Sequence, residues 1–140
     1  MDMVFIVTVL SKAAKYLDRN GGSEVIKKSV NDLYGWIKAK LSRKSQKKKI
    51  EDVMSDPNNK KKVKQLDELL KDAIEDNELN KNELIEKIKY FERILQQNDS
   101  SWYKANLQDP QNTLNISGDH NIGIQDTPNS KIIINKRSNP

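Results

Sequence analysis

The sequence predicts an all-α fold: a small bundle of about four helices over residues 1–98, then a flexible linker at 99–112, a short β-forming segment at 113–135 and a tail at 136–140. Three observations predict this organisation. Before residue 98, apolar residues recur at spacings of three and four, which is the period of a helix face. The stretch that follows is polar and has no sustained period. Beyond residue 113, apolar and polar residues alternate as they do in a strand.

The composition indicates a small core. Only 35% of the 140 residues are hydrophobic, against roughly 45 to 50% in an ordinary globular domain. The absence of cysteine excludes a disulfide scaffold, a thiolate metal site and a cysteine nucleophile, and it favours a reducing compartment. The apolar stretch Val4–Leu10 is far shorter than the roughly 20 residues of a membrane-spanning helix. We therefore expect a cytoplasmic protein at rest.

The first predicted helix covers Met3–Leu17, which contains neither proline nor glycine and is followed by Gly21-Gly22. Its first half is apolar on every side, whereas its second half adds charged residues, so we expect nearly complete burial at one end only. In the resting protein this half is expected to be a buried core helix. It is also the candidate membrane-acting segment of an activated state, formed by Val4, Phe5, Ile6, Val7, Val9 and Leu10.

The second predicted helix begins at Ser23, a residue type that caps helix N-termini. Its apolar stripe has spacings of four, three, four and four residues and consists of Ile26, Val30, Leu33, Ile37 and Leu41. Tyr34 and Trp36 lie on or beside this stripe. Aromatic residues in such positions are either core residues or anchors at a membrane interface, and the pattern does not decide between the two.

A basic run follows this helix and carries most of the net charge of +5. Residues 1–50 hold 12 Lys and Arg against 4 Asp and Glu, whereas residues 51–98 hold 9 against 12. Cations suit a helix C-terminus, but the run has more of them than capping requires. It is the candidate basic surface for a membrane, since each cation near an anionic leaflet is worth roughly 1 kcal/mol. Its members are Lys38, Lys40, Arg43, Lys44, Lys47, Lys48 and Lys49.

Two further helices are predicted before residue 98. Asp56-Pro57 marks the start of the third, because Asp accepts hydrogen bonds from free amides and Pro suits the first helical position. Asn80 and Glu83 form a capping box at the start of the fourth. The linker predicted after it contains Asp109-Pro110.

The segment 113–135 contains three short apolar stretches separated by turns, and such strands cannot stabilise themselves in water. They could fold back on the helices, add to the edge of another protein's sheet, or stack on copies of themselves. The low charge and the abundance of Ile and Asn favour stacking, in which Asn ladders and dry Ile zippers form between identical chains. The residues expected to form this amyloid are Leu114, Ile116, Gly118, Asn121, Ile122, Gly123, Ile124, Gln125, Ile132 and Ile134.

Two parts of the chain resemble known modules. The stretch Asn115–Asp126 with Ser130–Asn135 resembles C-terminal bacterial amyloid signalling motifs related to the RIP homotypic interaction motif (RHIM). The preceding region resembles the Bell domain that occurs ahead of such motifs. It shares the Gly-Gly break, a helix with Tyr34 and Trp36 that ends in basic residues, and the Asp-Pro restart.

The resemblance implies a non-enzymatic cell-death effector of bacterial innate immunity against phage. A receptor of the nucleotide-binding STAND or NLR-like type, carrying a matching motif, would template the C-terminal segment into a prion-like fibril. The clustered helical domains would then be driven onto the anionic inner membrane, as in pore-forming effectors, because many weakly binding copies bind strongly together. The implied partners are therefore other copies of the chain, the receptor and the membrane, with no cofactor, metal or small-molecule substrate.

Two other classes of function remain open at this stage. The helical bundle could be an adaptor that recruits a separate effector, with the C-terminal segment used only for assembly. Alternatively, residues 38–49 could bind nucleic acid without sequence specificity, although the run lacks interleaved aromatic residues. An enzyme is the least supported class, because His120 is the single histidine and no nucleophile, base and orienting group can be assembled.

Overall fold

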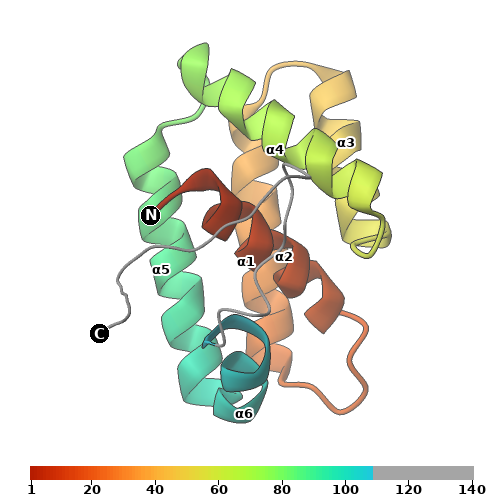
Figure 1. Cartoon of the computed structure of the whole chain (residues 1–140), viewed down its shortest axis with the longest axis vertical. Helices are drawn as coiled ribbons and strands as arrows, with labels where there is room; N and C mark the ends of the chain where they lie inside the picture. Colours follow the sequence, from red (N-terminus) through yellow and green to blue (C-terminus); the bar gives the residue numbers. More distant parts are fainter. Residues whose placement is uncertain (109–140) are drawn as a thin grey trace, which may run out of the picture.

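The computed structural model describes residues 1–108, and all of its regular elements in this range are helical (Figure 1). The prediction of an all-helical domain is therefore confirmed for these residues. The ten predicted amyloid residues and His120 lie outside the described residues. The elements are α1 (Met3–Tyr16), α2 (Glu24–Lys40), α3 (Lys44–Ser55), α4 (Lys60–Glu75), α5 (Lys81–Asn98), α6 (Ser100–Tyr103) and a π-helical turn, η1 (Lys104–Gln108).

Helix α1 lies at the centre of the bundle. It packs against α2, α3, α4, α5 and η1, while α2 pairs with α5 and α3 pairs with α4. Figure 1 shows α1 in front of α2, with α5 on one side and the α3–α4 pair on the other. The apolar residues of α1 are therefore enclosed by helices from every other part of the described chain.

The helix starts follow from side-chain capping. Asp2 Oδ1 accepts a hydrogen bond from the Phe5 amide at 2.9 Å, and Ser23 Oγ accepts one from the Ile26 amide at 3.3 Å. Asn80 Oδ1 accepts from the Glu83 amide at 3.0 Å. The N-caps expected at Ser23 and Asn80 are thus confirmed, because each oxygen satisfies an amide that has no partner within its own helix. The predicted capping box at Asn80 is only half formed, since the hydrogen bonds of residues 1–108 do not include one from the Asn80 amide to the Glu83 side chain.

The third predicted helix begins later than Asp56-Pro57 indicates. Asp56 and Asn59 close a turn through a backbone hydrogen bond of 3.2 Å, and Pro57 is buried within it. Asn59 then caps α4, with Oδ1 accepting from the amides of Lys61 and Lys62 at 3.0 and 3.2 Å. The Asp-Pro pair therefore forms a turn ahead of the helix, and the cap lies three residues further on.

The second predicted helix is also two helices in the structure. Helix α2 ends at Lys40, and Leu41 adopts an extended backbone that places its side chain in the core with 3% exposure. Helix α3 restarts at Lys44, where Gln46 Oε1 accepts a hydrogen bond from the Arg43 amide at 2.9 Å. Ile50 and Val53 give α3 a buried face of its own. The domain thus contains five long helices where four were predicted.

Residues 100–108, which fall within the predicted linker at 99–112, form α6 and η1. They pack on the end of α5 and on α1. Leu107 is buried and Trp102 and Tyr103 are half-buried against the core cluster. The helical domain therefore extends at least ten residues beyond the predicted boundary at 98.

Candidate membrane-acting helix and basic surface

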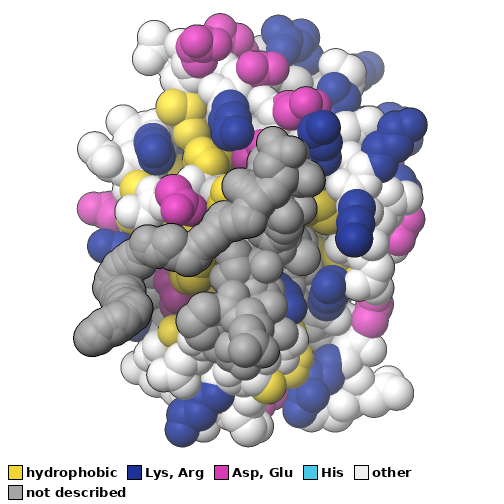
Figure 2. All heavy atoms as spheres, in the orientation of Figure 1, with side chains coloured by type: hydrophobic (Ala, Val, Ile, Leu, Met, Phe, Trp, Pro, Cys, Tyr) yellow, Lys and Arg dark blue, Asp and Glu magenta, His cyan; other side chains and the backbone are white. Residues whose placement is uncertain are grey.

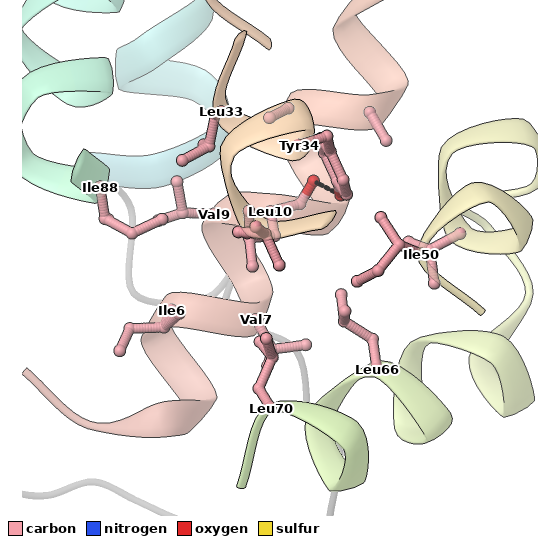
Figure 3. Packing of buried hydrophobic residues seen from close by; sticks show 14 of the residues in the cluster. Ile6, Val7, Val9, Leu10, Leu33, Tyr34, Ile50, Leu66, Leu70 and Ile88 are labelled. Atoms are coloured by element: carbon pink, nitrogen blue, oxygen red, sulfur yellow. Dashed lines mark hydrogen bonds between the residues drawn. The ribbon is translucent and has the colours of Figure 1, made fainter. Parts of the chain in front are cut away.

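Four of the six predicted membrane-acting residues lie in the middle of the hydrophobic core. Ile6, Val7, Val9 and Leu10 are fully buried at 0% exposure, Phe5 is half-buried, and Val4 is 36% exposed. Figure 3 shows their neighbours, which come from every other long helix: Leu33 and Tyr34 of α2, Ile50 of α3, Leu66 and Leu70 of α4, and Ile88 of α5. In this fold none of the four fully buried residues can reach a membrane unless α1 moves.

The pattern of α1 predicts nearly complete burial in its first half only, but the structure buries both halves. It begins at Ile6 and continues to Tyr16, and it includes the polar residues Thr8, Ser11 and Lys12. The two hydroxyls satisfy themselves within the helix, since Thr8 Oγ1 donates to the Val4 carbonyl at 2.7 Å and Ser11 Oγ donates to that of Thr8 at 3.1 Å. The expectation was wrong because α1 is surrounded by α2, α3, α4, α5 and η1, which together cover both halves of the helix.

Lys12 is the buried cation of α1, with 8% of its surface exposed. Desolvation by burial lowers the pKa of its ammonium, and the nearby Lys15 lowers it further. A depressed lysine pKa means that the charged form is less favourable in the folded protein than in water. The charge on Lys12 at neutral pH therefore lowers the free energy of unfolding of the packed α1.

The basic run does not form one continuous patch of free cations. Lys38 and Lys40 lie on α2, Arg43 precedes α3, and the other four residues of the run lie on α3. Lys38 is paired with Glu51 at 2.8 Å, and Lys48 with Asp52 at 3.6 Å. Figure 2 shows Lys and Arg side chains spread along the right-hand side, over α3 and α4, with Asp and Glu between them. Lys44 and Lys49 are exposed and Lys47 is half-buried, and none of the three has an acidic partner among the ion pairs of residues 1–108.

Tyr34 and Trp36 have different environments although they are two residues apart. Tyr34 is fully buried, its hydroxyl donates to the Leu10 carbonyl of α1, and burial raises the pKa of that hydroxyl. Trp36 is half-buried against the edge of the core, and the ammonium groups of Lys40 of α2 and Lys87 of α5 each lie 5.5 Å from its ring centroid. Tyr34 is thus a core residue, and Trp36 is an aromatic surface residue flanked by cations.

A polar cluster around Asp99, which sequence reasoning missed, joins the two ends of the domain. Its Oδ2 accepts a hydrogen bond from the Tyr16 hydroxyl at 2.7 Å and lies 3.3 Å from Arg19 Nε. The Tyr16 hydroxyl also accepts from the Ser23 amide at 2.9 Å. We call Tyr16, Arg19, Ser23, Asp99 and Trp102 the Asp99 cluster. Tyr16 and Asp99 are 83 residues apart, so no local pattern could have linked them.

The hydrogen bond from Tyr16 is the main cause that holds the pKa of Asp99 below its usual range. The Trp102 amide, Arg19 and Ser101 lower it further, while burial opposes them. The pKa of Tyr16 is raised, chiefly by burial. At neutral pH the carboxylate is therefore ionised and the phenol protonated, which is the state in which the phenol donates to the carboxylate.

Within residues 1–108, no helix combines the length and hydropathy that a transmembrane span requires. In the same part of the chain, no group of three or more His, Asp or Glu side chains is arranged to hold a metal ion.

Comparisons with family models, with curated proteins and with solved structures find no match to this chain. The resemblance to Bell domains and amyloid signalling motifs therefore remains a prediction from the residues quoted above.

Proposed function

We propose that this protein is a non-enzymatic membrane-acting effector in which α1 leaves the bundle and binds a lipid surface when the segment 113–135 assembles with other copies. The observation that carries the proposal is the all-round burial of α1. An amphipathic helix needs cover on one face, but α1 is enclosed by five other elements. A helix of this kind is stable either inside a protein core or against lipid.

The energy of burial keeps α1 in place in a single molecule. Burying an aliphatic side chain is worth about 1.5–3 kcal/mol, so the four fully buried residues of α1 account for about 6–12 kcal/mol. This is similar to the whole stability of an ordinary domain, about 5–15 kcal/mol. Spontaneous release is therefore rare, and a lipid surface that replaces the lost burial is needed to drive it.

The length of α1 indicates how it would bind. Its 14 residues extend about 21 Å, against a hydrocarbon core of about 30 Å. We propose that α1 lies in the interface, with its apolar side chains in the lipid, and that it does not span the bilayer alone. The turn at Gly21-Gly22, where Gly21 has a φ of 72°, connects it to α2. Lys44, Lys47 and Lys49 would attract anionic lipid from α3.

Assembly supplies the switch in this proposal. A STAND or NLR-like receptor with a matching motif would seed a fibril of 113–135 in the cytoplasm, and the fibril would hold many helical domains together at the inner membrane. Because the binding of each domain is weak, the clustered copies bind far more strongly than separate ones. The role in bacterial defence by cell death belongs to the resemblance and is proposed on that basis.

The proposal is tested with a charge at the exposed N-terminal end of α1. Val4 is 36% exposed, so Val4→Asp leaves the core intact but adds a charge to the helix that enters lipid. The matched control is Val25→Asp, because Val25 of α2 is 52% exposed. With full-length protein seeded by fibrils of the 113–135 peptide, we expect Val4→Asp to lower dye release from phosphatidylglycerol-containing liposomes at least tenfold. We expect Val25→Asp to leave the release unchanged.

The adaptor function is the second candidate, and the complete burial of the four core residues of α1 favours it, since no apolar surface of theirs is available to lipid at rest. An adaptor assembles without damaging membranes. It predicts that fibril-seeded protein releases no dye from anionic liposomes, whichever residue stands at position 4.

A further inference from the structure

We infer that residues 99–108 act as a clasp that holds α1 in the bundle, and that opening this clasp is the first step by which the C-terminal segment releases α1. The inference rests on the proposed function. The clasp consists of Asp99, α6 and η1, and the chain runs from it directly into residue 109. Along the chain, the clasp therefore lies between the C-terminal segment and α5.

The polar attachment of the clasp to the end of α1 is made by one carboxylate, that of Asp99. One oxygen of Asp99 accepts a hydrogen bond from the Tyr16 hydroxyl at 2.7 Å and forms an ion pair with Arg19 Nε at 3.3 Å. The other oxygen accepts the Trp102 amide and Ser101 Oγ, both at 3.3 Å, and so caps α6. The same side chain therefore starts the clasp helix and binds the end of α1, which couples the formation of α6 to the position of α1.

The Tyr16 ring is fixed on both sides. Its ring meets that of Trp102 edge to face, with the centroids 5.0 Å apart and the planes at 89°. On another side it approaches Gly22 so closely that a Cβ atom there would lie 3.0 Å from Tyr16 Cε1. The Tyr16 hydroxyl also accepts a hydrogen bond from the Ser23 amide. The phenol of Tyr16 therefore connects the clasp, the end of α1 and the start of α2.

The clasp has few buried side chains. Leu107 is its one buried residue, Trp102 and Tyr103 are half-buried, and Ser100, Ser101, Lys104 and Gln108 are exposed. A segment with few buried apolar side chains opens at a lower free energy than a core helix. Its position therefore depends on the Asp99 cluster together with the packing of Leu107 and Tyr103, and loss of the cluster removes a large share of what holds it.

Two conservative variants and one control test the clasp in the full chain. Tyr16→Phe removes the hydroxyl but keeps the ring, and Asp99→Asn removes the charge but keeps a side chain that caps helices. Tyr34→Phe is the control, because it deletes another tyrosine hydroxyl that bonds α1, at the Leu10 carbonyl. Amide hydrogen exchange is measured in residues 100–108 and in α1, followed by dye release from phosphatidylglycerol liposomes.

We expect both clasp variants to speed exchange in 100–108 and in the C-terminal half of α1 by roughly tenfold, the factor that a hydrogen bond to a charged group supplies. Tyr34→Phe should leave 100–108 unchanged. The inference is overturned if 100–108 opens while α1 stays protected, or if the control opens both regions equally. If the clasp variants show the expected exchange but no variant releases dye, the clasp stands and the proposed membrane function fails.

Discussion

Individual side chains of α1 and α2 show how far burial depends on position within one turn of helix. Tyr34 and Trp36 flank the same apolar stripe, yet Tyr34 bonds to the backbone of α1 while Trp36 lies between two lysines at the surface. The difference is the direction of the side chain around the helix axis, about 200° for two residues. Composition alone carries no such information, because both residue types occur in cores and at interfaces.

The buried cation Lys12 leads to a prediction for stability. Replacing it by Met removes a charge whose pKa is lowered by burial and keeps a similar length of apolar chain. We expect Lys12→Met to raise the free energy of unfolding at pH 7 by ~1 kcal/mol, measured by urea denaturation. The gain should shrink as the pH rises towards the pKa of Lys12, because the parent protein then sheds the charge that destabilises it.

Lys64→Met is the matched control for this substitution, since Lys64 is an exposed residue of α4. It should change the stability by less than ~0.5 kcal/mol. In the membrane assay, Lys12→Met should slow dye release, because α1 is then held more firmly. If both lysine substitutions raised the free energy of unfolding equally, the burial of Lys12 would not be the cause of the gain.

The break between α2 and α3 is a feature of whole elements. Gln46 caps α3 through the Arg43 amide and also donates to Glu78 Oε1 at 3.3 Å, while Ser42 donates to Glu78 Oε2 at 3.0 Å. Glu78 is held in place by the end of α4, where Asn77 adopts a φ of 63° and the amides of Asn77 and Glu78 bond back to Ile74 and Ala73. This pattern is a Schellman motif, which Asn tolerates.

We predict that Gln46→Ala destabilises the domain by about 1–2 kcal/mol, because it removes an N-terminal cap and leaves one Glu78 oxygen without its partner. Thermal unfolding followed by circular dichroism measures the effect. Ser45→Ala, at the neighbouring exposed position, is the control and should have little effect. A Gln46→Ala protein as stable as the parent would mean that the break is held by Leu41 and the apolar face of α3 alone.

Much of the helical part could be predicted from the sequence, and the failures share a physical cause. The caps at Ser23 and Asn80 could be predicted because an N-cap side chain bonds to an amide only three residues away. The apolar stripes could be predicted because residues on one helix face recur every three or four positions. The break at Leu41 and the clasp were missed. Each depends on contacts between distant residues, such as Gln46 with Glu78 and Tyr16 with Asp99. The candidate residues of α1 were identified by type, but the enclosure of Ile6, Val7, Val9 and Leu10 by four other long helices was not.

The clasp gives a prediction for acid pH. Because the pKa of Asp99 is depressed in the folded protein, its contribution to stability is present at neutral pH and is lost as the pH falls through that pKa, below the ordinary value of about 3.9. Trp36→Phe leaves Trp102 as the single tryptophan of the chain. We expect its fluorescence to shift to longer wavelength below about pH 4 as the Tyr16 and Arg19 contacts weaken. Asp99→Asn should remove this transition.

For the whole molecule, the arrangement of charge matters more than its amount. The net charge of +5 is modest, and the cations of α3 lie near those of α4 on the same side of the bundle (Figure 2). In the proposed function, recruitment to an anionic surface would therefore depend on which cations face the lipid together with α1. The proposal assigns this role to Lys44, Lys47 and Lys49 of α3.

We predict that replacing these three lysines by Gln weakens binding of the fibril-seeded protein to phosphatidylglycerol liposomes by about 100-fold. Each cation near an anionic leaflet is worth about 1 kcal/mol, and every 1.4 kcal/mol is a factor of ten. The matched variant carries Lys60→Gln, Lys61→Gln and Lys64→Gln, three exposed positions of α4 with the same change in net charge. Co-sedimentation at several salt concentrations measures both. If the α3 residues face the lipid, the α4 variant keeps most of its affinity. If both variants lose the same affinity, attraction depends on net charge alone, and α3 has no orienting role at the membrane.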